Sequence, residues 1–493
     1  MDELLNLYAD LENPEPPKNK MQKHQKPMPK QQKKTVPQKV PITQKKKEIK
    51  NEKKPQVNKI NADKKYDPLS ILGPKKKDDD NDDNNIIPGA ENIKSKIDIN
   101  NIENIIENMN DKKYKYKSVE ELQNILKKKA EENNLNTEEN KAFLVYCWVA
   151  KNLSYFVGSK PDNSPLGALQ KRITQCSGYC RLFKELLKIF NIKSVLVHGC
   201  GRTYSLSIKP KTENHEWNAI KINGEYYLCE VTWGSGKVEN GKFIPSYNTY
   251  YFCCPPDQFI QTHLPSKDLE KWQLLTKKIS QNDFDNLLYK DKFFYLYGFT
   301  EINPNEGVVK LNNKNIYEVK IVNKNEVKNL RISCKVYLEQ NIIENASCIE
   351  KFGNYFLIHL IFNKKGKYNI LIFATDKSGT AHSDLIIRQQ YIVSSSLNEN
   401  KLFPTMLTFP DELHIIQPKF NNLTKNKEIE FKFSSNDIED MGIVVDKKCV
   451  HLSKNDNVFE GKFVVKGEEV LVGKFTPDNP GNLKVMVKYS IKK

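Results

Sequence analysis

Apolar residues recur at helical spacing between about residues 118 and 190, and this pattern predicts three helices. Ser118 and Glu121 form a capping box before the first helix, and Thr137 caps the second. The third begins at Cys176 and carries its apolar residues on one face, as a helix packed against a core does. The apolar positions of the third helix are Tyr179, Leu182, Phe183, Leu186, Leu187 and Phe190.

After the third helix the pattern changes to alternation, which predicts strands. Strands are expected at 194–198 and 204–208, and a hairpin at 216–222 and 225–231 around Asn223-Gly224. From about residue 300 onward, short alternating runs form two sets, each the length of one antiparallel sandwich. The expected strands are 317–322, 330–338, 355–361 and 367–374 in the first set, and 428–433, 459–465, 470–475 and 483–490 in the second.

These patterns divide the chain into four parts. Residues 1–117 read as a disordered tail rich in Lys and Pro, with 11 of the 24 prolines. Residues 118–298 form a mixed α+β core, and 299–396 and 400–493 form the two β-sandwiches.

The net charge of +17 belongs to the tail. Residues 11–77 contain 20 Lys, no Arg and six acidic residues, so the rest of the chain is nearly neutral. These lysines lack interleaved arginines or aromatic residues, so sequence-specific nucleic-acid binding is not expected. Salt-sensitive attraction to an acidic surface, such as a filament, is the partner interaction that the tail supports.

Composition narrows the class of protein further. Hydrophobic residues make up 38% of the chain, enough for real cores, yet no apolar run approaches the roughly 18 residues of a membrane span. The start, Met1-Asp2-Glu3, lacks the features of a secretory signal. The ten cysteines are therefore expected to be reduced thiols in a cytoplasmic protein without membrane insertion.

Cys176 is the candidate nucleophile among those thiols. It lies at the expected start of a helix, where free backbone N–H groups and the helix dipole favour a thiolate. Ser177-Gly178 permits close backbone approach and offers amides for an oxyanion. The alternative for any single cysteine is a buried, inert thiol, and Cys180, one turn further on, is read that way.

The hairpin supplies a candidate base and an orienting carboxylate. A two-residue turn pairs Trp217 with Glu230, and it places His215 diagonally from Glu230 on the same face. Diagonal neighbours lie about 7–8 Å apart at Cα, within reach of an imidazole–carboxylate hydrogen bond. The second nitrogen of His215 would then be free for a thiol. The alternative is a strand-edge histidine that pairs with a surface glutamate.

Other chemistry has less support. Cys253 and Cys254 with Cys229 and His263 could be imagined as a metal site, but no C-x-x-C spacing exists, so buried thiols are expected. Nucleotide-binding glycine motifs are absent, and no cofactor or metal is expected. The tryptophans read as core or cleft walls, namely Trp217, Trp233 and Trp272.

Three segments, in order, resemble the transglutaminase-like family, and specifically its kyphoscoliosis peptidase type. The segments are Gln175–Tyr179, His215–Ala219 and Tyr227–Gly234, which match the C-x-G-Y, H-x-W-N-A and D-x-T-W-G patterns of that family. The resemblance continues through His263-Leu264-Pro265 and Trp272–Leu275 into the β-rich part, where this type carries immunoglobulin-like domains. It covers about 118–493 and leaves out only the tail.

By this resemblance, Cys176 would be the nucleophile, His215 the general base and acid, and Glu230 the third member of the triad. Two positions depart from the family pattern. Glu230 stands where the family has Asp, which moves the carboxylate by about one methylene, and Phe156 stands where an Asp is common. Some cytoskeletal relatives keep this fold without catalysis, so the first departure bears on activity.

The sequence therefore predicts a transglutaminase-like (papain-like) cysteine core followed by two immunoglobulin-like β-sandwiches and preceded by a disordered tail. The expected function is a cysteine-type acyl-transfer enzyme, closer to a peptidase or amidase than to a crosslinking transglutaminase, acting on protein substrates. The alternative is a catalytically impaired scaffold that binds cytoskeletal proteins, with a location at the cytoskeleton.

Overall fold

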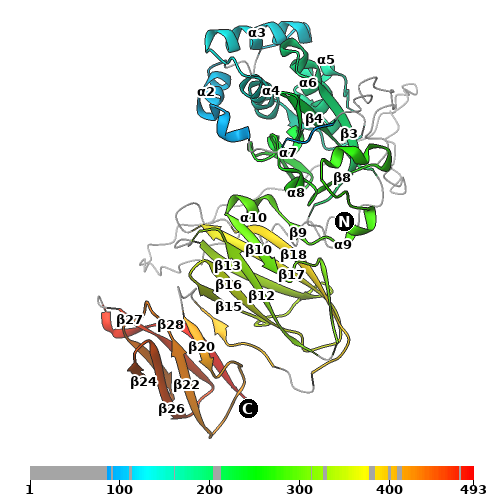
Figure 1. The fold of residues 1–493 in the computed structure, drawn as a ribbon. Coiled ribbons are helices and arrows are strands. Elements are labelled where there is room, and N and C mark those ends of the chain that lie inside the picture. Colours follow the sequence, from blue (N-terminus) through cyan, green and yellow to red (C-terminus); the bar gives the residue numbers. More distant parts are fainter. Residues whose placement is uncertain are drawn as a thin grey trace, which may run out of the picture.

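The protein is described by a computed structural model in which three bodies follow one another from top to bottom of Figure 1: a helical core with a small sheet, then two β-sandwiches. The described residues are 86–492 except 90–92, 110–113, 160, 204–212, 313, 326–329, 377–382, 398–400, 408–412 and 477–478. The predicted basic tail up to residue 85 and the expected strand at 204–208 lie outside them.

The helices predicted from periodicity form, and their caps are those that the sequence indicates. The hydroxyl of Ser118 accepts a hydrogen bond from the Glu121 amide at the start of α3, and Thr137 accepts from the Asn140 amide at the start of α4. Helix α4 is buried on almost every side and forms the centre of the body. The helices of this part are α2 (Ile99–Met109), α3 (Val119–Glu132), α4 (Glu138–Asn152), α5 (Pro165–Lys171), α6 (Cys176–Leu187) and α7 (Val231–Ser235), with the 3-10 turns η3 (Ile93–Lys96) and η4 (Lys188–Phe190).

The small sheet packs beside α6, and its four strands are all antiparallel, in the order β5-β4-β3-β8. The strands are β3 (Ser194–Gly201), β4 (His215–Ile222), β5 (Glu225–Cys229) and β8 (His263–Pro265). The predicted Asn223-Gly224 hairpin is confirmed, since both turn residues have positive φ and Ile222 pairs with Glu225. The register holds as far as Asn218 opposite Cys229.

The second hairpin strand ends two residues before the predicted position. Glu230 leaves the strand and becomes the N-cap of α7, where its side chain accepts hydrogen bonds from the Thr232 and Trp233 amides. The predicted cross-strand pair of Trp217 with Glu230 is therefore wrong. A strand that turns directly into a helix cannot continue the ladder.

Ordered structure also begins earlier than residue 118. Helix α2 lies within the range predicted to be tail, and its residues Ile102, Ile105 and Ile106 are buried in the same apolar cluster as α4. A segment with many Asn and Lys residues on either side can still bury three isoleucines placed three and one residues apart.

The predicted β-sandwiches are both confirmed. In the first, one sheet has the order β10-β12-β16-β15 and the other β11-β18-β17-β13-β14. Their strands are β10 (Phe299–Asn303), β11 (Val308–Leu311), β12 (Ile316–Asn323), β13 (Leu330–Leu338), β14 (Asn341–Ile342), β15 (Ser347–Phe352), β16 (Tyr355–Ile361), β17 (Gly366–Asp376) and β18 (Asp384–Val393).

The second sandwich repeats this plan, with sheets in the orders β19-β28-β27-β23-β24 and β20-β22-β26-β25. Its strands are β19 (Thr405–Met406), β20 (His414–Gln417), β21 (Leu423–Thr424), β22 (Glu428–Ser434), β23 (Met441–Val445), β24 (Lys448–His451), β25 (Ser453–Asn455), β26 (Val458–Val464), β27 (Glu469–Thr476) and β28 (Asn479–Lys492). The eight strands predicted from alternation correspond to β12, β13, β16, β17, β22, β26, β27 and β28.

The core joins the first sandwich through a shared sheet. Strand β9 (Tyr289–Lys290) pairs antiparallel with β18 of the sandwich, so the last part of the core extends the sandwich sheet. The connecting elements between β5 and β10 are short: β6 (Gly236–Glu239), β7 (Lys242–Pro245), α8 (Pro256–Phe259), η5 (Lys267–Gln273), α9 (Gln281–Asn286) and α10 (Lys292–Leu296).

The packing of α2 gives a stability prediction. Replacing Ile102, whose side chain is fully buried, with Ala should lower the free energy of unfolding by about 2–5 kcal/mol, because the lost apolar contacts leave a cavity. Urea unfolding followed by circular dichroism measures this. The exposed Asn104 on the same helix is the control, and Asn104→Ala should change stability little. Equal stability of both variants would contradict the packing of α2 on the core.

Candidate functional site

Cys176 is the first residue of α6, as the sequence predicts, and Gln175 is the N-cap. The start of this helix is held in place from two sides. A side chain at Gly178 would overlap Thr174, so glycine allows the preceding segment to approach the helix closely. The Ser177 hydroxyl donates to Glu216 on β4 across 2.7 Å, and both residues are buried. These contacts fix the position of the Cys176 thiol relative to the sheet.

His215 is the first residue of β4 and points toward the start of α7. Its Nε2 lies 2.6 Å from Oε2 of Glu230, so the predicted imidazole–carboxylate contact forms although the predicted cross-strand register does not extend that far. Room for the ring comes from β3, because a Cβ at Gly201 would lie only 3.0 Å from Cβ of His215. The other ring nitrogen, Nδ1, is left for the hydrogen bond between His215 and the Cys176 side chain.

The carboxylate of Glu230 also caps helix α7. Its Oε1 accepts hydrogen bonds from the Thr232 amide at 2.8 Å and from the Trp233 amide at 3.0 Å. One oxygen therefore caps α7 while the other holds His215. The longer side chain of glutamate reaches both partners from a single backbone position.

Burial and charge act in opposite directions on this pair. Burial alone would lower the pKa of His215, but the Glu230 carboxylate and the Cys176 side chain together raise it to about 10. Burial likewise favours the neutral form of Glu230, yet His215 and a second histidine hold the pKa of this carboxyl well below its usual range. The pair is therefore an imidazolium–carboxylate ion pair at neutral pH.

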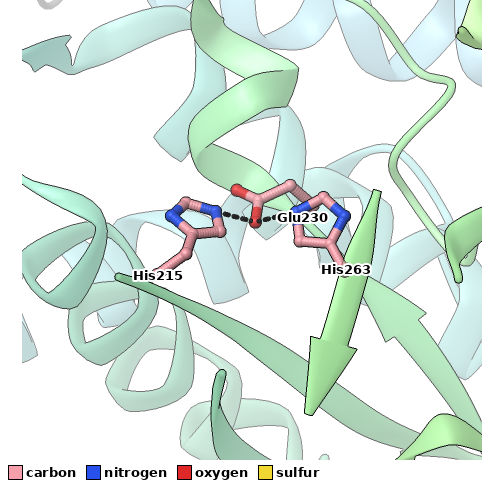
Figure 2. A group of neighbouring side chains, drawn as sticks. All are labelled: His215, Glu230 and His263. Carbon is pink, nitrogen blue, oxygen red and sulfur yellow. Dashed lines mark hydrogen bonds and ion pairs between the residues drawn. The ribbon is translucent and has the colours of Figure 1, made fainter. Parts of the chain in front are cut away.

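The second histidine is His263 on β8, whose side chain is fully buried and whose Nε2 lies 3.4 Å from the same Oε2 of Glu230 (Figure 2). From the sequence alone, His263 stands out only as part of a family segment and as one residue of an imagined cysteine metal site. Strand pairing was the missing signal, because β8 lies beside β3 with His263 opposite Gly201. The segment His263–Pro265 is too short for its sequence pattern to predict either a strand or the pairing of that strand with β3.

Aromatic residues line the core and the site, and the three tryptophans lie where the sequence predicts core or cleft walls. Trp217 and Trp272 are fully buried, while Trp233 is half-buried with its ring 5.4 Å from that of His215. Phe259 stacks on His263 with ring centres 4.3 Å apart. The triad is enclosed on this side by rings rather than by water-filled space.

The cysteines imagined as a metal site lie elsewhere. The sulfur atoms of Cys229 and Cys253 are 3.9 Å apart, and Cys254 is buried nearby, but His263 points to Glu230 instead. Burial raises the pKa of the Cys254 thiol to about 12 and that of Cys253 well above its usual value. Cys180 is fully buried as well, and burial raises its pKa strongly. These thiols are of the inert, buried type.

Comparison with known proteins shows which family this part of the chain resembles. Residues 125–231 match the transglutaminase-like superfamily. Over 176 residues the chain is 28% identical to kyphoscoliosis peptidase of Mus musculus, and this covers 34% of the chain and 26% of that protein. Over 192 residues it is 26% identical to hillarin of Drosophila melanogaster, covering 35% of the chain and 23% of that protein.

A solved crystal structure, that of the class 5 fimbriae chaperone CfaA, covers 39% of this chain and 99% of its own. Its identity to this chain is 14% and its TM-score is 0.14.

The core is thus a transglutaminase-like domain. More particularly, it is of the type found in kyphoscoliosis peptidase, and the resemblance and the fold class predicted from the sequence are both confirmed. The chain covers about a quarter of the length of the curated relatives it matches. In the described part of the chain, no helix has the length and apolar content required to cross a membrane.

The double role of Glu230 predicts the effect of restoring the family's usual residue. Glu230→Asp should slow the alkylation of Cys176 by iodoacetamide by about ten- to a hundredfold, because the shorter side chain cannot cap α7 and also reach His215. Mass spectrometry of Cys176 gives the rate. Glu225→Asp, on the same hairpin but bonded to Tyr227, is the matched control. Faster alkylation in Glu230→Asp would mean that glutamate weakens the triad.

Proposed function

We propose that this chain is a cysteine-type acyl-transfer enzyme that acts on protein substrates through Cys176, His215 and Glu230. The observation that carries the proposal is the position of His215, whose side chain forms hydrogen bonds with both the Cys176 side chain and the Glu230 carboxylate. A thiol, a base and a carboxylate that orients the base are the parts that nucleophilic cysteine catalysis requires.

In the proposed reaction His215 already carries its proton, as the imidazolium that pairs with Glu230, and the sulfur of Cys176 reacts as a thiolate. The thiolate attacks the carbonyl carbon of an amide, a C–S bond forms, and the negative charge moves to the carbonyl oxygen. In this proposal backbone N–H groups in the first turn of α6 stabilise the oxyanion. The amide of Gly178 is not among them, because it donates to the Gln175 carbonyl. His215 then gives its proton to the leaving nitrogen as the C–N bond breaks, which leaves a thioester on Cys176.

A second half-reaction releases the acyl group. His215 takes a proton from water or from an amine, and the resulting nucleophile bonds to the thioester carbonyl carbon. The C–S bond then breaks, which releases the acyl group and returns the Cys176 thiolate beside a protonated His215. Water gives hydrolysis, as in a peptidase or amidase, and a primary amine gives a new amide bond, as in a transglutaminase. We favour hydrolysis, in keeping with the similarity to kyphoscoliosis peptidase.

The burial of Cys176 supports a second candidate function. Its side chain has 0% exposure, and His215 has 7%. A closed site with a glutamate in the third position suits a scaffold that uses the core and the two sandwiches to bind protein partners, including cytoskeletal proteins. For a scaffold, Cys176→Ala should retain every partner in a pull-down, and partner loss in that variant would count against it.

The enzyme proposal predicts an unusual pH profile for alkylation. Between pH 7 and 9 the rate for Cys176 should stay nearly flat, because His215, with its pKa raised to about 10, remains the cation that pairs with a thiolate. An ordinary thiol instead reacts faster as the pH rises toward about 8.5. Cys449 on β24 is exposed and serves as the internal reference. Parallel profiles for Cys176 and Cys449 would sink the enzyme proposal.

The nature of the acyl acceptor can be tested directly. We expect a denatured protein substrate mixed with the full chain and a fluorescent primary amine to gain new N-termini but no fluorescence, which is the pattern of hydrolysis. Cys176→Ala, as the negative control, should give neither product. Fluorescence without new N-termini would assign the crosslinking reaction instead, and the absence of both products from the wild-type protein would favour the scaffold.

A further inference from the structure

His263 lies outside the three-residue triad but contacts its carboxylate. It approaches Glu230 from the side opposite His215, so that the carboxylate lies between two imidazole rings (Figure 2). Both histidines face the same oxygen, Oε2, at 2.6 Å for His215 and 3.4 Å for His263. The second contact lies outside hydrogen-bond geometry, and Nε2 of His263 is a buried nitrogen without a hydrogen-bond partner among the described residues, so His263 is the weaker partner of the carboxylate.

The surroundings of His263 decide which of its nitrogens carries the proton. Burial lowers the pKa of His263 to about 4, so the ring is neutral at physiological pH and has a single N–H. The hydroxyl of Thr262 lies 2.8 Å from Nδ1 and can donate to it. Nε2 faces a carboxylate oxygen, which only accepts. The Thr262 hydroxyl also lies 3.4 Å from the Phe259 carbonyl, but its contact with Nδ1 is shorter. The consistent arrangement is therefore Thr262 O–H to Nδ1, with Nε2–H directed at Glu230.

This arrangement completes the set of donors around Glu230. Oε1 accepts from the amides of Thr232 and Trp233, and Oε2 accepts from His215 and faces the N–H of His263. A fully buried carboxylate needs such donors to remain charged. The other titratable groups near Glu230 are buried groups whose pKa is raised by burial, so they stay neutral: Tyr146, Tyr179, Cys180 and Tyr251.

The same three residues have donor atoms close enough together to suggest a metal site. The spacing does not suit one. Ligand atoms around a tetrahedral zinc ion, each about 2.0 Å from it, lie about 3.3 Å apart. His215 and Glu230 are 2.6 Å apart, which is a hydrogen-bond distance. A metal would have to break the contact on which the triad depends.

The packing of the His263 ring leaves it little freedom to turn away. Its ring centre lies 4.3 Å from that of Phe259, 4.5 Å from Trp233 and 5.1 Å from Trp217. Three aromatic rings therefore confine this side chain beside the Glu230 carboxylate.

We propose that His263 is a positioning residue, a neutral imidazole whose N–H holds the Glu230 carboxylate against His215 and so lets a glutamate serve where an aspartate is usual. The proposal rests on the function proposed for the triad, but its first consequence, the protonation of His215, can be measured without any catalysis. His263 fixes the carboxylate, the carboxylate stabilises the imidazolium of His215, and that cation keeps its proton to higher pH.

The test is a histidine NMR titration of the full chain in the Cys176→Ala background. His263→Phe keeps the ring packing but removes the donor, and it should lower the pKa of His215 by about one unit or more. His263→Gln places an amide N–H near the position of Nε2 and should restore most of that shift. His359→Gln, which alters a histidine bonded to Glu350 in the first sandwich, is the matched control and should leave His215 unchanged.

The result that would overturn the proposal is an unchanged His215 titration in His263→Phe, or equal shifts in His263→Phe and His263→Gln. If His263→Phe does not fold, Thr262→Val takes its place. Removing the hydroxyl frees the tautomer of His263 and should shift His215 in the same direction by a smaller amount. No shift in Thr262→Val would also overturn the proposal.

The experiments distinguish an error in the role of His263 from an error in the proposed function of the triad. If His215 shifts as expected but wild-type Cys176 shows the alkylation profile of an ordinary thiol, His263 positions the carboxylate of an inactive triad. If Cys176 has the flat profile and His263→Phe leaves both the titration and that profile unchanged, the enzyme function stands and the role of His263 is wrong.

Discussion

The site depends on keeping one carboxylate charged without water. Glu230 has no exposed surface, and an isolated buried charge of this kind is strongly unfavourable. The protein provides two backbone amides from the first turn of α7 and the cation of His215. Removing any of these donors changes more than one element, because the same side chain begins a helix and orients a histidine. The Glu230 side chain must therefore satisfy two requirements at once: it must cap α7 after β5, and it must orient the histidine of the triad.

Much of the fold follows from sequence periodicity. The helix at Cys176, the Asn223-Gly224 turn and the eight sandwich strands form where the pattern predicts them, because each depends on local spacing of apolar residues or on turn chemistry. The site was predicted through extension of the hairpin register to residue 230. That extension was wrong, yet His215 and Glu230 still meet, since the longer glutamate side chain spans the gap that the turn into α7 opens.

Two features could not be predicted because they depend on tertiary contacts. Helix α2 looks like part of a polar tail until Ile102 and its neighbours are seen against α4. His263 lies on a strand of three residues, and only the pairing of β8 with β3 brings it to Glu230. Neither signal is present in a local window of sequence. The roles of Cys176, His215 and Glu230 in catalysis remain predictions that the geometry permits and that only reactivity measurements test.

The burial of Cys176 has a consequence for how any activity would appear. A substrate carbonyl cannot reach a fully covered sulfur atom, so only the fraction of molecules in an opened state can react. The apparent affinity for substrate is then weaker than the intrinsic affinity by that fraction. A partner that binds the opened form would increase activity in proportion to the population it captures. Because the thiol is covered, any such activity would depend on the equilibrium between closed and opened conformations as well as on the triad.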